Sequence, residues 1–450
     1  MSRGTDIQSM IDLYPSGTTF CIAAGVYRIG AAIIPKSNDV LIGQSGAVLN
    51  GSKVLTSFTR DGSYWLASGQ TQQAPTYNAT CIPASYTGCI YPEDLFYDDR
   101  SLHQVTSLSN LTSGEFYFDY AADKIYIFDD PTGHEVEASY VPEAIRGYST
   151  YQTNVTVRGF MVEKFANWPS DKTYAISTGN GWIVENNEVR LNSGGGIQAG
   201  TGSVLRGNYV HDNGRLGVGV AFADNVLIEG NEIARNDADD FDFWNAGATN
   251  IWDSSNVTLR NNYVHDNQGH GLRTDGGCVS ILFEGNTVVD NTGIGIFHEV
   301  SYNAIIRNNT VRDNNTSQVG SSLFYGAQIQ DYDSPNVEIY GNTVEALSGT
   351  HGISLRDDDR GSGDLGKFEI KNVYVHDNTI EMDGAGMSGL AGNRSLDVYA
   401  GLGIRFENNS YYVKSSAGSY WYWGVGPTAP QTWGAWQTAG RDDAGNRALW

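Results

Sequence analysis

The chain has 450 residues, of which 28 are Lys or Arg and 51 are Asp or Glu, so its formal net charge is −23. Nucleic acids and anionic membrane surfaces attract clustered positive charge, so this balance argues against both as partners, and the sequence holds no transmembrane candidate. The 54 glycines follow no three-residue period and 12% of residues are aromatic, which argues against a collagen-like or a disordered chain.

Residues 1–55 are predicted to form an N-terminal cap and the first coils of a repetitive β structure. Thr5 is placed to N-cap a short helix over 6–13, which would cover the open end of the core. The first ten residues lack the apolar core of a signal peptide. We therefore expect a mature secreted, extracellular protein from which the signal peptide has been removed.

Residues 56–150 interrupt the pattern and are predicted to be a β-rich insertion that packs on the repetitive part. An alternating stretch predicts a hairpin with its turn at Ala121–Asp123. Cys81 and Cys89 are eight residues apart in a Gly/Pro/Ser-rich stretch and are predicted to form a disulfide. Cys21 and Cys278 are expected to be buried thiols, and no Cys/His spacing indicates a metal site.

Residues 151–410 repeat one phrase, an alternating apolar strand followed by a pair of polar residues. The second member of each pair is an asparagine, and the spacing between successive asparagines is 21 to 36 residues: Asn187, Asn208, Asn231, Asn262, Asn286, Asn309, Asn342 and Asn378. This predicts an all-β chain folded as a right-handed parallel β-helix, a solenoid with an asparagine ladder at one corner. We expect each ladder asparagine to adopt the left-handed bend conformation.

A second strand follows each pair, and its alternation predicts which side chains face outward. Aligning the coils places one outward column through Asp242, Arg273, Phe297, Gln328 and Ser354, and another through Trp244, Asp275, Glu299, Gln330 and Arg356.

These phrases resemble those of the right-handed parallel β-helix proteins of the pectate-lyase-like superfamily, over most of the chain. That resemblance implies the fold and a carbohydrate-active protein, whereas the reaction varies among hydrolases, lyases, epimerases, tailspikes and adhesins. Asp239-Asp240 and, one coil later, Gly269-His270-Gly271 resemble the paired-Asp and Gly-His-Gly motifs of polygalacturonase-type glycoside hydrolases.

The outward columns gather the chemistry that glycan cleavage needs. One carboxyl must protonate the leaving oxygen, and a second must act as nucleophile or activate water. Asp275 and Glu299, one coil apart, are the first candidates, and Asp242 is the third. The sequence leaves open whether Glu299 works with Asp275, at a retaining separation, or with Asp242, two coils away and nearer an inverting separation. The predicted substrate contacts are Arg273, Trp244, Gln330, Arg356, His270 and His298, although a hydrogen-bonded core position is the alternative for His298.

No resident cofactor is predicted. The run Asp357-Asp358-Asp359 could hold Ca²⁺ through its carboxylates, and a solvated turn is the alternative. Residues 411–450 are rich in aromatic side chains and are predicted to be a C-terminal cap, with a sugar-stacking surface as the alternative.

The leading hypothesis is an extracellular glycoside hydrolase that acts on an oligo- or polysaccharide. A polysaccharide lyase or uronate C5-epimerase, with Arg273 or Ca²⁺ neutralising the substrate carboxylate, is the first alternative, and the absence of Lys from both outward columns counts against it. A non-enzymatic tailspike- or adhesin-like glycan-binding solenoid is the second.

Overall fold

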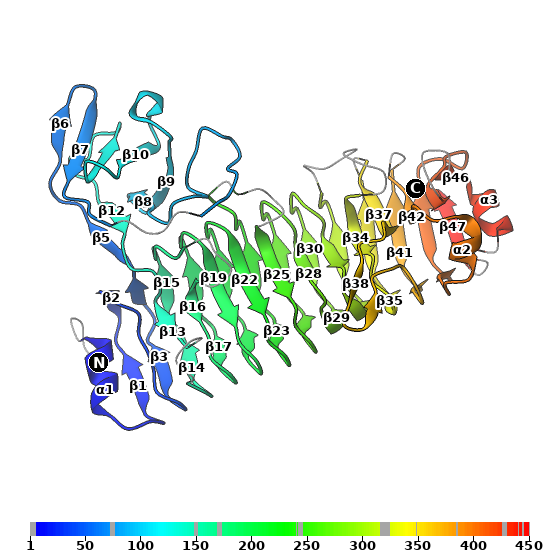
Figure 1. Cartoon of the computed structure of the whole chain (residues 1–450), viewed down its shortest axis with the longest axis horizontal. Helices are drawn as coiled ribbons and strands as arrows, with labels where there is room; N and C mark the ends of the chain where they lie inside the picture. Colours follow the sequence, from blue (N-terminus) through cyan, green and yellow to red (C-terminus); the bar gives the residue numbers. More distant parts are fainter. Residues whose placement is uncertain are drawn as a thin grey trace. The chain divides into compact units, whose positions relative to one another are not determined.

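The structure is a computed structural model that describes residues 6–72, 77–147, 152–168, 173–239, 241, 246–315, 325–347, 349–383, 386–424, 430–439, 441–442 and 445–449. The chain forms two compact units. Met1–Gly219 and Arg235–Ala246 form the first, and Val220–Ala234 and Gly247–Trp450 form the second. Within each unit, short strands stack in parallel on three sheets, here called A, B and C (Figure 1).

Alternation explains why these segments form coils. In the coil that contains β26 (Thr258–Arg260), β27 (Tyr263–His265) and β28 (Leu272–Asp275), the middle residue of β26 and of β27 is fully buried. Asn261 and Asp266 have positive φ angles of 54° and 55° and turn the chain after β26 and after β27. Three strands and their bends therefore close one coil around an apolar interior, which makes the architecture a parallel β-helix.

The first unit stacks its coils on three sheets. Sheet A holds β1 (Thr19–Ile22), β3 (Val40–Gly43), β14 (Thr156–Arg158), β17 (Ile183–Glu185) and β20 (Val204–Arg206). Sheet B holds β2 (Gly25–Arg28), β4 (Ala47–Asn50), β15 (Met161–Glu163), β18 (Glu188–Arg190) and β21 (Tyr209–His211). Sheet C holds β13 (Ile145–Arg146), β16 (Tyr174–Ser177) and β19 (Gly195–Ala199), and the chain enters the second unit within β22 (Leu216–Ala221).

A separate, mainly antiparallel sheet in the first unit is inserted between β4 and β13. Its spatial order is β5 (Ser52–Val54), β12 (Val136–Ser139), β8 (Leu95–Tyr97), β9 (Arg100–Gln104), β10 (Glu115–Asp119), β11 (Lys124–Ile127), β7 (Tyr64–Ser68) and β6 (Thr59–Asp61), with a 3-10 turn at Leu108–Asn110. Asp119 pairs with Lys124, so the hairpin turn lies where the sequence predicts it.

The Cys81–Cys89 disulfide is confirmed. Cys278 is buried as expected, but Cys21 is exposed because its side chain points outward from β1.

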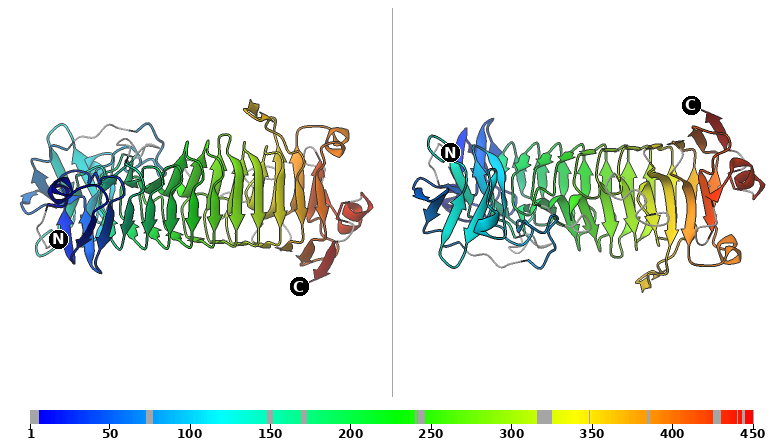
Figure 2. Two further views of the ribbon diagram at one scale, coloured as in Figure 1. Left: turned by 90° about the horizontal axis from the view of Figure 1, so that it is seen from below. Right: turned by 90° about the horizontal axis from the view of Figure 1, so that it is seen from above.

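The second unit stacks more coils in the same way, side by side in Figure 2. Sheet A holds β23 (Leu227–Glu229), β26, β29 (Val279–Glu284), β32 (Tyr302–Arg307), β35 (Val337–Tyr340), β40 (Tyr374–His376) and β43 (Arg405–Glu407). Sheet B holds β24 (Glu232–Ala234), β27, β30 (Thr287–Val289), β33 (Thr310–Arg312), β36 (Thr343–Ala346), β41 (Thr379–Met382), β44 (Ser410–Val413) and β47 (Asn446–Leu449). Sheet C holds β25 (Gly247–Trp252), β28, β31 (Ile296–Glu299), β34 (Ala327–Tyr332), β37 (His351–Asp357), β42 (Ser388–Gly392), β45 (Trp421–Gly424) and the antiparallel β46 (Pro430–Gln431).

Buried asparagines link neighbouring coils at one corner, as the sequence predicts. In the second unit, the Nδ2 of Asn262 donates to Oδ1 of Asn286 at 2.9 Å and to the backbone oxygen of Ile228 at 2.9 Å. The predicted left-handed conformation of the ladder asparagines is wrong. The residue before each ladder position adopts it instead, for example Asn261, because the bend precedes the inward side chain.

A second asparagine ladder runs five residues after the first and was missed. It comprises Asn192, Asn213 and Asn236 in the first unit, and Asn267, Asn291, Asn314 and then Gln328 in the second. Its sequence signal is an asparagine two residues after each sheet B strand from β18 to β33.

Short helices lie near the two ends of the chain. The cap helix α1 (Ile7–Leu13) is N-capped by Asp6, one residue later than predicted, because the Asp6 carboxylate accepts the Ser9 backbone N–H. Near the C-terminus, α2 (Leu396–Ala400) and α3 (Trp433–Thr438) accompany Trp421 and Trp436, which are fully buried. Burial of these rings supports the cap interpretation over the sugar-stacking one. Among the described residues, no helix is long and apolar enough to cross a membrane.

Candidate functional site

The candidate site lies on the outward face of sheet C in the second unit. Leu272 of β28 pairs with Ile296 of β31, and both are fully buried. By alternation, Arg273 and Asp275 therefore point outward from β28. Asp275 and Glu299 each directly follow the paired residues Thr274 and His298, so they occupy the same column one coil apart, as the sequence predicts.

The rest of this column differs from the prediction. The neighbour of Glu299 on the next strand is Tyr332 rather than Gln330, and Arg356 follows Tyr332. Gln330 pairs with Phe297 instead. The predicted columns are two residues out at β34, because Ile329 rather than Ala327 follows Ile296 in the interior column.

The coil before Asp275 also differs from the prediction. Its sheet C strand is β25 rather than 241–245, so the residue beside Asp275 is Trp252. Two predicted site residues, Asp242 and Trp244, lie outside the described residues.

Arg273 bridges the two candidate carboxyls. Its Nη2 donates to Oδ2 of Asp275 at 2.8 Å and to Oε1 of Glu299 at 2.6 Å. Since one nitrogen binds both oxygens, these oxygens can be no more than about 5.4 Å apart. This upper bound is shorter than the about 6.5–9.5 Å of inverting glycosidases and is compatible with the about 5–5.5 Å of retaining ones. The arrangement thus supplies two neighbouring carboxyls with one shared cation.

The two carboxyls differ in their surroundings. The side chain of Asp275 is 24% exposed, whereas that of Glu299 is 1% exposed. Burial raises the pKa of Asp275, an effect that the charge of Arg273 opposes and that of Glu299 reinforces. Glu299 is faced by two guanidinium groups, because Arg360 Nη1 donates to its Oε2 at 2.6 Å. Asp275 is therefore the carboxyl that solvent reaches, and Glu299 is the one that the two arginines enclose.

Aromatic rings and arginines surround the pair. Arg356 and Arg360 lie over the ring of Tyr332, with the guanidinium carbon 5.0 Å and 4.6 Å from its centroid. Arg356 also lies over Tyr325, and Arg273 over Phe297. These cation–π contacts hold the guanidinium groups against the sheet face.

The two predicted histidines do not face this site. His298 is fully buried in the inward column, where its Nδ1 lies 2.7 Å from Oγ1 of Thr274. Burial lowers its pKa to about 3. His270 is also buried, its Nδ1 accepts the Ile294 backbone N–H, and burial holds its pKa well below 6.5. The prediction that His298 contacts substrate is therefore wrong because alternation turns its ring into the core, and the burial of His270 does not fit a substrate contact.

The run Asp357–Asp359 does not converge on one point. Asp357 is buried and bound by Arg394 and Tyr399, whereas Asp359 pairs with Lys367. Asp358 accepts a hydrogen bond from the hydroxyl of Tyr332 at 2.7 Å. Among the described residues, no three His, Cys, Asp or Glu side chains are grouped so that they could hold a metal ion. This dispersal does not support a Ca²⁺ site at the run.

Two residues of this face, Tyr332 and Arg360, were not singled out from the sequence, and Asp358 was considered only as a possible Ca²⁺ ligand. Tyr332 was hidden by the register error. Arg360 and Asp358 lie after β37, and their positions depend on the path of that loop. The sequence signal for them was weak, since the stretch reads as a charged turn.

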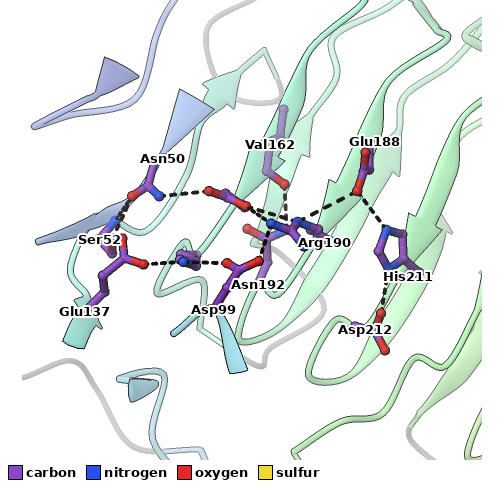
Figure 3. Close-up of polar contacts among 12 residues, drawn as sticks. Asn50, Ser52, Asp99, Glu137, Val162, Glu188, Arg190, Asn192, His211 and Asp212 are labelled. Atoms are coloured by element: carbon purple, nitrogen blue, oxygen red, sulfur yellow. Dashed lines mark hydrogen bonds and ion pairs between the residues drawn. The ribbon is translucent and has the colours of Figure 1, made fainter. Parts of the chain in front are cut away.

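A second polar cluster lies in the first unit, where the inserted sheet meets the coils (Figure 3). Seven side chains form a closed ring of contacts, here called the polar ring: Asn50, Ser52, Glu137, Lys164, Asp99, Arg190 and Glu163. Lys164, only 3% exposed, contacts Glu137 and lies 2.7 Å from Asp99. Both acids belong to the inserted sheet or its turns, so the polar ring fastens that sheet to the coils.

Comparison with known proteins supports the architecture. A family model described as right-handed beta helix region matches residues 174–344. No curated protein sequence matches the chain. Together with the structural similarities below, the family match confirms the predicted all-β right-handed parallel β-helix.

Three solved structures resemble the chain at low sequence identity. XylC in complex with xylose is 16% identical, with a TM-score of 0.69 over 90% of this chain and 80% of that one. The A-module of the Azotobacter vinelandii mannuronan C-5 epimerase AlgE6 is 16% identical, with a TM-score of 0.55 over 98% and 94%. PfbA, a surface adhesin of Streptococcus pneumoniae, is 12% identical, with a TM-score of 0.54 over 94% and 89%. Their different activities mean that these similarities describe the fold alone.

Proposed function

We propose that the protein is a glycoside hydrolase and that Asp275 and Glu299 are its catalytic carboxyls. The observation that carries the proposal is their placement in one outward column, joined by a single nitrogen of Arg273. One carboxyl protonates the glycosidic oxygen, and the other attacks the anomeric carbon, as their short separation requires. Arg273 stabilises the negative charge on whichever of the two carboxyls is ionised at each step.

The substrate is an oligo- or polysaccharide that lies on the sheet C face. Trp252, the neighbour of Asp275 in the same column, is 41% exposed and offers aromatic surface for a sugar ring. The solved structure of XylC contains xylose, which supports a sugar as ligand of this architecture. The disulfide Cys81–Cys89 supports an extracellular location, because such bonds persist in oxidising compartments.

A lyase or C5-epimerase is the second candidate, favoured by the similarity to AlgE6. That chemistry removes a proton beside a carboxylate and needs a free base together with a cation. Arg273 could neutralise the substrate carboxylate, but it is already bound to both acids of the column. The pair of carboxyls fits hydrolysis better. An adhesin-like binding solenoid would not require a closely spaced acid pair.

The test is incubation with a panel of neutral and uronate glycans. A hydrolase releases new reducing ends, a lyase produces unsaturated products that absorb in the ultraviolet, and an epimerase changes neither signal but alters the proton spectrum of the polymer. An active substrate then allows the roles to be assigned. Azide should rescue Glu299→Gln and Asp275→Asn with opposite product anomers, since azide replaces either the nucleophile or the activated water.

A further inference from the structure

The Glu299 carboxylate is held from two sides. Oε1 accepts from Nε of Arg273 at 3.0 Å and from its Nη2 at 2.6 Å. Oε2 accepts from Nη1 of Arg360 at 2.6 Å. With its side chain 1% exposed, Glu299 cannot touch a glycan while both arginines are in place.

The two arginines are anchored differently. Arg273 lies within β28, its side chain is 10% exposed, and its backbone N–H donates to Oγ1 of Thr249. Arg360 lies between β37 and β38 (Ser362–Gly363), the first strand of a hairpin completed by β39 (Gly366–Lys367), and its side chain is 36% exposed. A loop residue can move without breaking the sheet, whereas Arg273 cannot.

Asp358 fixes the start of this loop. Its Oδ2 accepts from the Tyr332 hydroxyl at 2.7 Å and from Nε of Arg356 at 2.8 Å. Its backbone N–H donates to Oδ1 of Asp333 at 2.8 Å. Since Tyr332 neighbours Glu299 in the same column, these contacts place Arg360 over Glu299.

We propose that Arg360 is a positioning residue that covers Glu299 in the free protein and is displaced from it when substrate binds. The inference deepens the proposed function, on which its kinetic part rests. The covered state keeps Glu299 oriented and shielded from water. Binding of a sugar at the column supplies hydroxyl groups that can replace Arg360 on Glu299, while Arg273 remains in place.

Covering can be measured without any substrate. Carbodiimide activation in the presence of glycinamide converts accessible carboxyls to amides, which peptide mass spectrometry locates and quantifies. We expect Glu299 to be labelled at least about tenfold faster in Arg360→Gln than in the parent, the factor that corresponds to the loss of one hydrogen bond to a charged group. Exposed Glu338 serves as the reference within each sample. Arg312→Gln is the matched control, since Arg312 is a surface arginine paired with Asp313 on sheet B, and it should label Glu299 at the parental rate.

Asp358→Asn provides a second variant in case Arg360→Gln does not fold. It weakens the anchor of the loop while Arg360 stays intact, so Glu299 should also be labelled faster, by a smaller factor. Parental labelling of Glu299 in whichever variant folds would overturn the proposal.

The kinetic arm uses a glycan that the parent hydrolyses. Removing the positive charge of Arg360 should move the acid limb of the kcat/KM profile to higher pH, because in the free protein the Arg360 charge lowers the pKa of Asp275. A purely structural role would lower activity without moving this limb, and that result would also overturn the proposal. If no glycan is hydrolysed but Glu299 labelling responds to Arg360, the proposed function fails and the covering role stands.

Discussion

Arg273 and Glu299 are joined by two hydrogen bonds, at 3.0 Å and 2.6 Å, that end on the same carboxylate oxygen. Two adjacent carboxyls by themselves would repel, and neutralising one of them would then preserve or raise stability. The structure places a cation between them, so loss of the Glu299 charge leaves Arg273 and Arg360 without their shared partner.

The first prediction concerns catalysis. Glu299→Gln and Asp275→Asn should each lower turnover on a confirmed glycan by about 10²–10⁴-fold, the usual contribution of acid–base groups. Glu299→Gln should also lower the melting temperature more than Asp275→Asn does, because the Glu299 side chain is almost fully buried and has two cationic partners. Turnover and thermal unfolding measured on the same preparations test both statements.

The matched control is Glu338→Gln. Glu338 is an outward acid on sheet A that contacts His376, away from the sheet C column. It should retain parental turnover. Asp357, which lies closer to the site, is unsuitable as a control because that carboxylate is fully buried and bound by Arg394. Near-parental turnover in both site variants would place the catalytic centre elsewhere.

The second prediction is a pH dependence of stability that arises from His298. Burial lowers its folded-state pKa to about 3, against 6.5 for the unfolded chain. The unfolded state therefore binds this proton first, so the contribution of His298 to stability is complete above pH 6.5 and is lost as the pH falls toward 3. The loss amounts to about 1.4 kcal/mol per pH unit within this window.

His298→Gln removes that titration and can retain a hydrogen bond to Thr274. Chemical denaturation at several pH values should show a shallower decline for the variant than for the parent between about pH 6 and pH 4. The other buried histidines, His270 and His351, titrate in both proteins and cancel in the comparison. Parallel curves would show that the His298 ring already gains its proton in the folded state.

The third prediction concerns Asp331, which follows His298 in the inward column and is itself followed by Leu355. It is fully buried, and no described residue donates a hydrogen bond to either carboxylate oxygen, although Ser334 is near enough to oppose part of the effect of burial. Burial raises its pKa well above 3.8, so this carboxyl costs the folded state increasingly as the pH rises above about 4.

Asp331→Leu should therefore stabilise the protein at neutral pH by about 1–3 kcal/mol, with a smaller gain in acid. Asp331→Asn keeps the shape without the charge and controls for crowding by the larger side chain. Denaturant unfolding at neutral and acidic pH checks the sign. A parent more stable than both variants at neutral pH would mean that the carboxyl has an interior partner.

The sequence was sufficient to predict the fold because the relevant signal is local and repeated. Alternating strands and one asparagine per coil determine which residues face inward, whatever the lengths of the loops. The face with Arg273, Asp275 and Glu299 followed from the same counting, since β28 and β31 are separated by a short, uninterrupted coil. The count failed at β34, where the preceding coil carries a long insertion and an alanine, Ala327, imitates the apolar residue at the start of the inward column.

The loop residues could not be found in this way. Arg360 reaches Glu299 across 61 residues of sequence, and its position depends on Asp358, Tyr332 and Asp333 acting together. No local pattern encodes such a path. The sequence could not predict the ion-pair partners of Asp357 and Asp359 either, because neighbouring carboxylates bind different partners once the chain is folded.

The fourth prediction tests the asparagine ladder. Asn262→Ala and Asn286→Ala should each destabilise the protein by about 1–3 kcal/mol, because each leaves buried backbone groups of neighbouring coils without a partner. Each asparagine bonds both the next ladder member and a backbone oxygen. Asn446→Ala, at an exposed position that contacts Ser410, is the control and should cost far less. Equal unfolding midpoints for all three variants would contradict the ladder's contribution.

The last prediction concerns the polar ring. Lys164→Met keeps the length of the side chain and the positive φ of 62° at this bend, but leaves Glu137 buried without its lysine. Breaking a buried ion pair from one side costs about 3–5 kcal/mol.

Lys367→Met, which removes an exposed pair with Asp359, should cost at most about 1 kcal/mol. Adding Glu137→Gln to Lys164→Met should recover part of the loss, because the uncompensated charge is then gone. Denaturant unfolding of the single and double variants decides the matter: a double variant less stable than Lys164→Met would show that Arg28, which also contacts Glu137, already compensates that carboxylate.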